Sequence, residues 1–75
     1  MRRGIEMSVD SYSYQVMWLE QDQEFVGLCL ELPSLSWLAP TQEEASSGIR
    51  ALAADVVADM ESNGEVVPEP MRGGD

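Results

Sequence analysis

The sequence predicts an α+β domain: a three-stranded antiparallel sheet, one long helix and a short final strand. Two observations support this prediction. Residues 12–38 contain three short apolar runs separated by polar turns, which is the pattern of neighbouring strands. Residues 42–62 then repeat apolar side chains at helical spacing, directly after a residue that can cap a helix. Consecutive strands followed by a helix are typical of α+β folds.

The first predicted strand covers residues 12–20. Tyr14, Val16 and Trp18 recur at every second position, which places them on one side of a strand. The polar residues 21–23 that follow lack glycine. A two-residue turn of the primed type is therefore disfavoured, and a loop of three to five residues around a type I turn is expected.

The second predicted strand covers residues 24–32 and is apolar on both of its faces. Such a run is typical of a strand that is covered on both sides. Pro33 ends it, because proline has no N–H to donate to a central ladder. A short third strand is expected over residues 35–38.

The helix is predicted over residues 42–62. Thr41 and Glu44 form a capping-box pattern at its start, and Gly64 suits the left-handed position after its end. Gly48 lowers helix propensity by about 1 kcal/mol relative to alanine, so we expect it to mark close packing against the sheet. The apolar face comprises Ala45, Ile49, Leu52, Ala53, Val56 and Met60.

The chain of 75 residues is sufficient for one domain. We expect a flexible tail over residues 1–11, the domain over residues 12–68 with a short edge strand at 66–68, and disorder over residues 69–75. A domain this small buries only about 60% of its unfolded surface. It therefore needs additional support, and we expect a homo-oligomer or a partner protein to provide it.

The composition argues against stabilisation by a disulfide or a zinc ion, and against binding of nucleic acid. Cys29 is the only cysteine and there is no histidine, so neither an intrachain disulfide nor a zinc site is expected. The net charge is −10, from 14 acidic residues and four arginines, so we expect no direct binding of nucleic acid. The acidic surface either confers solubility or attracts a basic partner.

The sequence also bears on localisation. No run approaches the roughly 20 apolar residues that cross a membrane. The two N-terminal arginines, Arg2 and Arg3, are not followed by the apolar segment of a signal peptide. With a free thiol in addition, these features predict a cytoplasmic protein.

Seven side chains are candidates for contact with a partner. One helix covers only one face of a sheet, yet the first strand is apolar on both sides, so we expect a partner to cover the open face. The alternatives are that polar side chains cover this face, that the tryptophans belong to the core, and that the acidic helix surface is simply solvated. The candidates are Met17, Trp18, Leu19, Trp37, Glu43, Asp55 and Asp59.

No catalytic, cofactor or metal site is expected. Asp55 and Asp59 lie one turn apart on the exposed side of the predicted helix, and Asp22 and Glu24 lie beside a turn. Metal-dependent nucleases need carboxylates that converge instead. Cys29 lies in the most apolar strand without a histidine to activate it, which favours an inert thiol.

Five short motifs follow one another along residues 12–70. They are Tyr14-Gln15-Val16, Glu20-Gln21-Asp22-Gln23-Glu24-Phe25-Val26, Glu31-Leu32-Pro33-Ser34-Leu35, Thr41-Gln42-Glu43-Glu44-Ala45, and Gly64 followed by Pro68-Glu69-Pro70. Their order and spacing resemble the HicB antitoxin family over most of the chain. Two positions depart from the family pattern: Ser34 replaces the usual glycine of the bend, and Pro40 precedes the cap where Asp or Gly is common.

This resemblance implies a partial RNase H-like fold without catalysis. It also implies that the chain binds a small basic RNase toxin of the HicA type and blocks its activity. Longer members carry a C-terminal DNA-binding module, and no such module follows the helix in this sequence, so we expect a short member without that part of the function. The alternative is an oligomeric scaffold or regulatory module that has no toxin partner.

Overall fold

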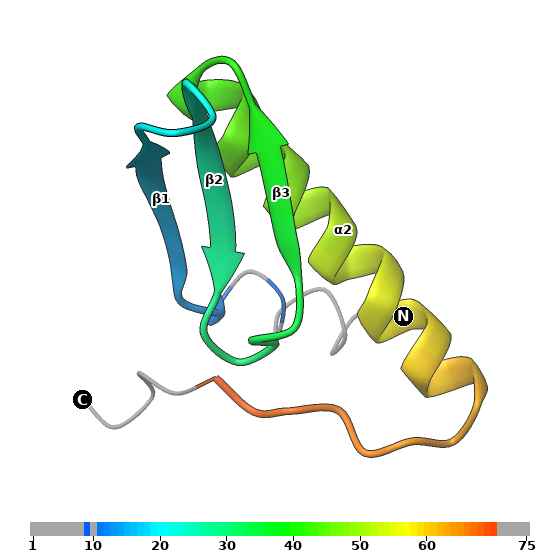
Figure 1. Cartoon of the computed structure of the whole chain (residues 1–75). Helices are drawn as coiled ribbons and strands as arrows, with labels where there is room; N and C mark the ends of the chain where they lie inside the picture. The colour runs from blue at the N-terminus through cyan, green and yellow to red at the C-terminus, as the bar shows by residue number, and fades with distance from the viewer. Residues whose placement is uncertain (1–8, 10, 71–75) are drawn as a thin grey trace.

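Three antiparallel strands and one long helix form the fold of the described residues. The structure is a computed structural model that describes residue 9 and residues 11–70. The elements are β1 (Tyr14–Leu19), β2 (Glu24–Cys29), β3 (Ser36–Ala39) and α2 (Gln42–Ser62). The strands lie in the order β1-β2-β3, and α2 crosses one face of the sheet (Figure 1). The predicted α+β class is confirmed.

The strands pair in regular antiparallel register around β2. β1 pairs with β2 from Tyr14 opposite Cys29 to Leu19 opposite Glu24, with no residue left over. The hairpin loop between them has four residues, as expected, and Gln23 takes the left-handed conformation with φ 54°. The side-chain amide of Gln23 donates to the carbonyl of Glu20 at 2.8 Å, which holds this turn.

All three strands differ from their predicted bounds. β1 covers Tyr14–Leu19 rather than residues 12–20. β2 ends at Cys29 rather than at residue 32, because the chain turns at Leu30 and the Leu32 N–H donates to the Cys29 carbonyl at 3.1 Å. The Ser13 N–H, which a longer ladder would use, donates instead to the Glu31 carboxylate at 2.8 Å. β3 is shifted by one residue relative to the prediction and covers Ser36–Ala39.

Both ends of α2 carry the predicted caps. The Glu44 N–H donates to the Thr41 hydroxyl at 3.1 Å, which satisfies one of the free donors of the first turn. At the other end Gly64 has φ 74°, and the Glu65 N–H donates to the Met60 carbonyl at 2.9 Å. This pattern is a Schellman motif, so the helix ends where the sequence predicted.

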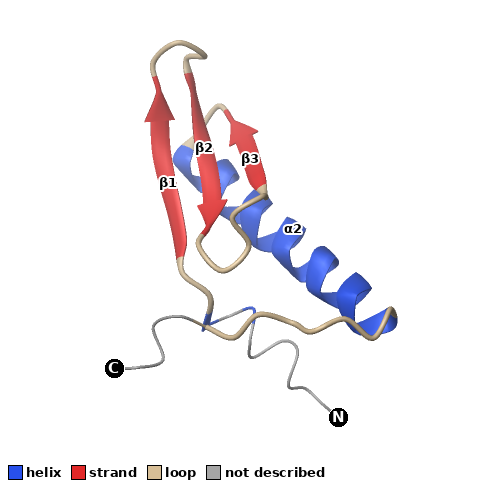
Figure 2. Ribbon diagram, turned by 60° about the horizontal axis from the view of Figure 1, so that its bottom comes forward, coloured by secondary structure: helices blue, strands red, loops and turns tan. Residues whose placement is uncertain are grey.

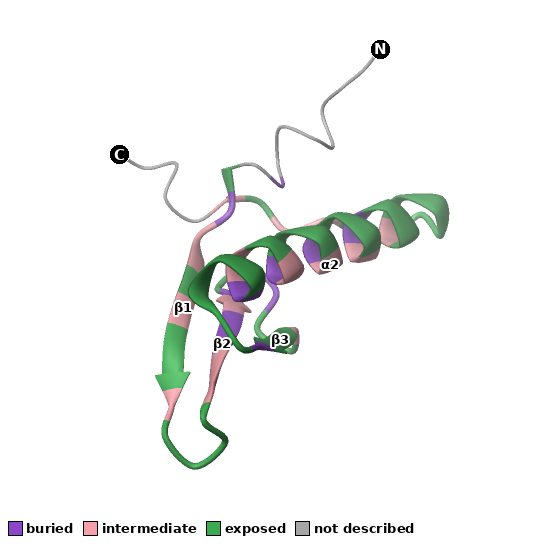
Figure 3. Cartoon of the chain, turned by 90° about the horizontal axis from the view of Figure 1, so that it is seen from above, coloured by how far each residue is buried: buried purple, intermediate pink, exposed green. Residues whose placement is uncertain are grey.

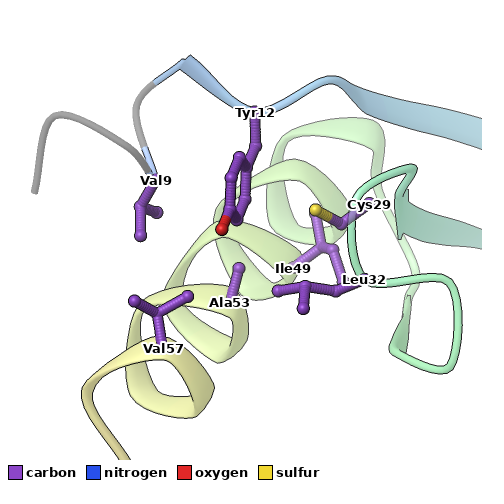
Figure 4. Packing of buried hydrophobic residues seen from close by; sticks show 7 residues of the cluster. All are labelled: Val9, Tyr12, Cys29, Leu32, Ile49, Ala53 and Val57. Carbon is purple, nitrogen blue, oxygen red and sulfur yellow. The ribbon is translucent and has the colours of Figure 1, made fainter. Parts of the chain in front are cut away.

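The core lies between α2 and the sheet. The buried helix residues repeat every four positions, and they meet Cys29, Leu32 and Tyr12 from the other side (Figure 4). The predicted face included Val56, but Val57 is the fully buried residue and Val56 is half-buried, because the buried positions follow a four-residue repeat from Ala45. The buried helix residues are Ala45, Ile49, Ala53 and Val57.

Both ends of the described chain contribute to this core or its border. Val9 is buried in the core, although residues 1–11 were predicted to be a tail. Residues 1–8 and 10 lie outside the described residues, as do residues 71–75 of the predicted C-terminal tail.

The predicted short strand at residues 66–68 is absent from the structure. Residues 65–70 instead run as an irregular segment past the base of the sheet (Figure 2). Pro68 and Pro70 have no N–H groups for a ladder, which disfavours a strand here. The segment is attached through the Tyr12 hydroxyl, which donates to the Pro68 carbonyl at 2.6 Å.

Gly27 sets the distance between α2 and the central strand. A Cβ atom at this position would lie 2.5 Å from the Ala45 carbonyl oxygen and 2.8 Å from Ile49 Cγ2. Both atoms belong to buried parts of the helix, and one of them is backbone. The absence of a side chain at Gly27 therefore allows the close approach of helix and sheet.

We predict that Gly27→Ala destabilises the fold by about 1–3 kcal/mol, the usual cost of overpacking a well-packed core. Equilibrium unfolding in urea measures this change. Gly64→Ala is the matched control: its Cβ would meet nothing within 4 Å, so only the left-handed backbone is penalised, by about 1 kcal/mol. A Gly27→Ala variant as stable as the original protein would contradict the role assigned to this contact.

Candidate partner interface

The pleat divides the candidate side chains between two faces of the sheet. Gly27 faces α2, and Val16 lies opposite it on β1, so Trp18 shares the helix-covered face. Met17 and Leu19 point to the other face, which α2 leaves uncovered. We call this second surface the open face; it comprises Gln15, Met17, Leu19, Glu24, Val26, Leu28, Ser36 and Leu38.

The open face is mostly apolar: five of its eight residues are apolar, Gln15 and Ser36 are polar, and Glu24 provides its one carboxylate. Met17, Val26 and Leu38 form a row across all three strands. Met17 and Leu38 are 49% and 50% exposed, whereas Val26 between them is only 8% exposed. The neighbours on the two outer strands thus shield the central residue, and the outer apolar surfaces remain in contact with solvent.

Trp18 lies near the hairpin end of the sheet, which extends past α2 (Figure 3). Its ring packs edge-to-face on Phe25, with the centroids 4.9 Å apart. Its Nε1–H donates to the Glu20 carboxylate at 2.9 Å, and the side chain is still 45% exposed. Two contacts therefore hold this large aromatic surface in one orientation, which lowers the entropy lost when a partner binds it.

Trp37 has a different environment. Its ring lies directly over Gly48 of α2, so close that an added Cβ would overlap the indole. The predicted close packing at Gly48 is therefore present, and Trp37 is its partner. Although 44% of Trp37 is exposed, the structure gives it a packing role between β3 and α2 and places it on the opposite side from Met17 and Leu19.

The three acidic candidates of the helix are exposed, but they do not form one cluster. Asp55 and Asp59 lie one turn apart, and Asp59 also accepts a hydrogen bond from the Asn63 amide at 3.4 Å. Glu43 lies in the first turn, about 18 Å along the axis from Asp55. The helix N-terminus stabilises a negative charge at Glu43, so this carboxylate has a local structural role as well.

Glu31, the first residue of the bend motif, is a buried carboxylate, and the sequence assigned it no role at the interface. It is only 6% exposed, and its carboxylate accepts from the Ser13 N–H at 2.8 Å and from the Cys29 thiol at 3.8 Å. The sequence feature that could have indicated this role is a charged residue placed between two leucines, Leu30 and Leu32. Glu31 joins the start of β1 to the end of β2 and thereby ends the ladder.

Cys29 and the two tyrosines surround this carboxylate. Burial raises the pKa of the Cys29 thiol, and the Glu31 charge adds to the effect, so the thiol is protonated at neutral pH. A protonated, buried thiol is a poor nucleophile, in line with the expected inert cysteine. Burial likewise raises the pKa of Tyr12.

Tyr14 shows the largest of these effects. Burial is the main cause that raises the pKa of Tyr14 to about 12, and the negative charges of ionised Cys29 and of Glu31 add to it. Arg50, whose guanidinium lies 4.5 Å from the ring centroid, opposes the shift. The neutral hydroxyl donates to the Val9 carbonyl at 2.8 Å, a bond that requires the proton.

Comparison with protein-family models, with curated proteins and with solved structures gave no match to this chain. Within the described residues, no helix is both long and apolar enough to cross a membrane. The same part of the chain holds no group of three or more acidic or cysteine side chains placed to bind a metal ion. The motifs and the surfaces are therefore the features of this chain that indicate its function.

We predict that Gly48→Ala and Trp37→Ala are strongly coupled. With Trp37 present, the new methyl group forces the indole away from the helix. In the Trp37→Ala background, the same change is expected to stabilise the helix by about 1 kcal/mol, the propensity difference between the two residues. Urea unfolding of the four proteins of this double-mutant cycle measures the coupling, and additive effects would show that the contact is unimportant.

We predict that stability falls as the pH rises from about 10 to 12, because unfolded tyrosine ionises near pH 10 while folded Tyr14 holds its proton to about 12. In this window the folded state binds more protons than the unfolded state, so alkali favours unfolding. Tyr14→Phe should reduce this dependence. Urea titrations at pH 8 and pH 11 test it, and an unchanged pH dependence in the variant would exclude Tyr14 as a source.

Proposed function

We propose that this protein is a HicB-like antitoxin, which binds a small basic HicA-type RNase toxin and covers its RNA-binding or catalytic face. In this proposal the chain has no catalytic activity of its own and acts in the cytoplasm. The proposal is supported by the motif order described above and by the three-strand sheet with one helix on which these motifs lie. The Thr41 cap and the left-handed Gly64 occupy the two ends of that helix.

The observation that carries the proposal is the acidic and aromatic end of the β1–β2 hairpin. Trp18 offers a large exposed ring that Phe25 and Glu20 hold in place. The exposed carboxylates of Glu20 and Asp22 lie in the loop beside it. Tryptophan is enriched among residues that dominate binding energy, and arginine, the basic residue most common at interfaces, binds both aromatic faces and carboxylates.

The net charge of −10 supports the same partner class. A strongly acidic protein attracts a basic one over distances longer than direct contacts, and this attraction raises the association rate. Asp55 and Asp59 add exposed charge on α2, away from the hairpin end. In this proposal they assist the approach of the toxin, whereas Trp18 provides the contact that keeps it bound.

The apolar open face favours a second candidate function, an oligomeric scaffold or regulatory module without a toxin partner. Met17 and Leu38 expose about half of their surface on this face. A hydrophobic surface of this kind on a small domain is typical of a protein-binding site. The two candidates differ in whether the chain inhibits an RNase, which is the property to measure.

We predict that the purified chain binds the HicA-type protein encoded beside its own gene and inhibits cleavage of a test RNA by that protein. Trp18→Ala should weaken the complex by about 30-fold or more, which corresponds to the roughly 2 kcal/mol of a dominant interface residue. Val66→Ala is the control, because Val66 is exposed and lies outside the hairpin. Isothermal titration calorimetry and the cleavage assay provide the two readouts.

Raising the salt concentration should slow association of this complex while changing its dissociation rate little, because long-range attraction between charged surfaces is screened. Normal binding by Trp18→Ala would reject the hairpin end as the contact. A chain that neither binds nor inhibits the toxin would reject the antitoxin function and leave the oligomeric module.

A further inference from the structure

The outer edge of β1 is unpaired within the described residues. β1 is the outermost strand, and neither β3 nor α2 lies along its outer side (Figures 1 and 2). The Leu30 N–H donates to the Ser13 carbonyl at 2.9 Å, so the backbone groups of Ser13 and of every second residue after it face β2. Because outward and inward groups alternate along a strand, the backbone groups of Tyr14, Val16 and Trp18 point away from β2.

β1 also lacks the features with which proteins usually protect an edge strand. Its sequence, Tyr-Gln-Val-Met-Trp-Leu, contains no charge, proline or glycine, and its register with β2 shows no bulge. Exposed edges normally carry lysine, proline or a bulge, or are very short. The other edge strand, β3, is short, with only four residues, and Pro40 directly after it prevents the strand from extending.

We propose that the outer edge of β1 pairs with the same edge of a second copy of this chain, which creates a continuous six-stranded antiparallel sheet. The two-fold axis passes through Val16, so that Val16 pairs with Val16 of the second copy and Tyr14 pairs with Trp18 of the second copy. All three outward-pointing residues then exchange backbone hydrogen bonds with their counterparts. This inference does not depend on the proposed antitoxin function.

The charge distribution favours a second copy of this chain, paired antiparallel, as the partner of the β1 edge. Glu20 lies four residues from Val16, so antiparallel pairing places the two Glu20 residues about 27 Å apart. This separation is more than three times the Debye length of about 8 Å at physiological salt, so the two acidic hairpin ends repel each other little. A basic partner finds no carboxylate on β1 itself, whereas an identical uncharged strand matches it along its whole length.

The pairing would also join the two open faces into one larger apolar surface. Met17 of one copy lies opposite Gln15 of the other in this register, so the two open faces meet without a charge between them. The acidic hairpin ends point in opposite directions and stay accessible. One paired edge buries less than the roughly 800 Å² per partner of a standard interface, so we expect a dissociation constant in the micromolar range.

Hydrogen exchange of the unaltered chain tests the proposal without any variant. The amide protons of Tyr14, Val16 and Trp18 should exchange about tenfold more slowly at ~1 mM than at ~10 µM protein, because pairing protects them only in the dimer. The amides of Gln15 and Met17 already bond to β2 and serve as internal controls. Exchange of all five amides that is independent of concentration would overturn the proposal.

Sedimentation equilibrium with two variants then locates the interface. The unaltered chain should approach twice the 8.3 kDa of one chain at high concentration. Val16→Pro removes an outward N–H but no bond to β2, and should leave a monomer. Leu38→Glu alters the open face far from β1 and should still dimerise. A dimer lost in Leu38→Glu but kept in Val16→Pro, or a monomeric unaltered chain, would overturn the proposal.

Discussion

The close approach of α2 to β2 at Gly27 is the constraint on which the rest of this small domain depends. Because Gly27 has no side chain, the Ala45 carbonyl and Ile49 can lie directly against the strand. The helix then buries the small residues Ala45 and Ala53 fully, together with Ile49 and Val57. A domain with so few large buried side chains depends on short distances between its layers, since dispersion contacts weaken rapidly as a gap opens.

The elements were predictable from sequence wherever a local signal defined them. The Thr41 cap and Gly64 specify both ends of the helix through backbone hydrogen bonds that involve only neighbouring residues. β2 was predicted three residues too long, because the apolar run continues to Leu32 although a buried carboxylate ends the ladder. The partner of that carboxylate, the Ser13 N–H, lies 18 residues away, and no local pattern reveals such a contact.

The candidate interface was predictable only in part. Alternation along β1 correctly separated Met17 from Trp18, because side-chain direction in a strand depends on local geometry. The roles of the two tryptophans could not be separated in this way. Trp37 lies over Gly48, whereas Trp18 lies near the hairpin end of β1. That difference depends on how far the hairpin extends past α2 (Figure 3). Likewise, Glu43 and Asp55 share a helix, yet three turns separate them.

The hydrogen bond between the Tyr12 hydroxyl and the Pro68 carbonyl brings the beginning and the end of the domain together at the base of the sheet. The hairpin loop of residues 20–23 lies at the opposite end of the strands (Figure 1). A fluorescent protein or affinity handle attached at either end of the domain would therefore emerge on the side remote from the hairpin. The same geometry makes the domain suitable for circular permutation. A short linker would join the two present ends, and new chain termini would lie in the exposed hairpin loop.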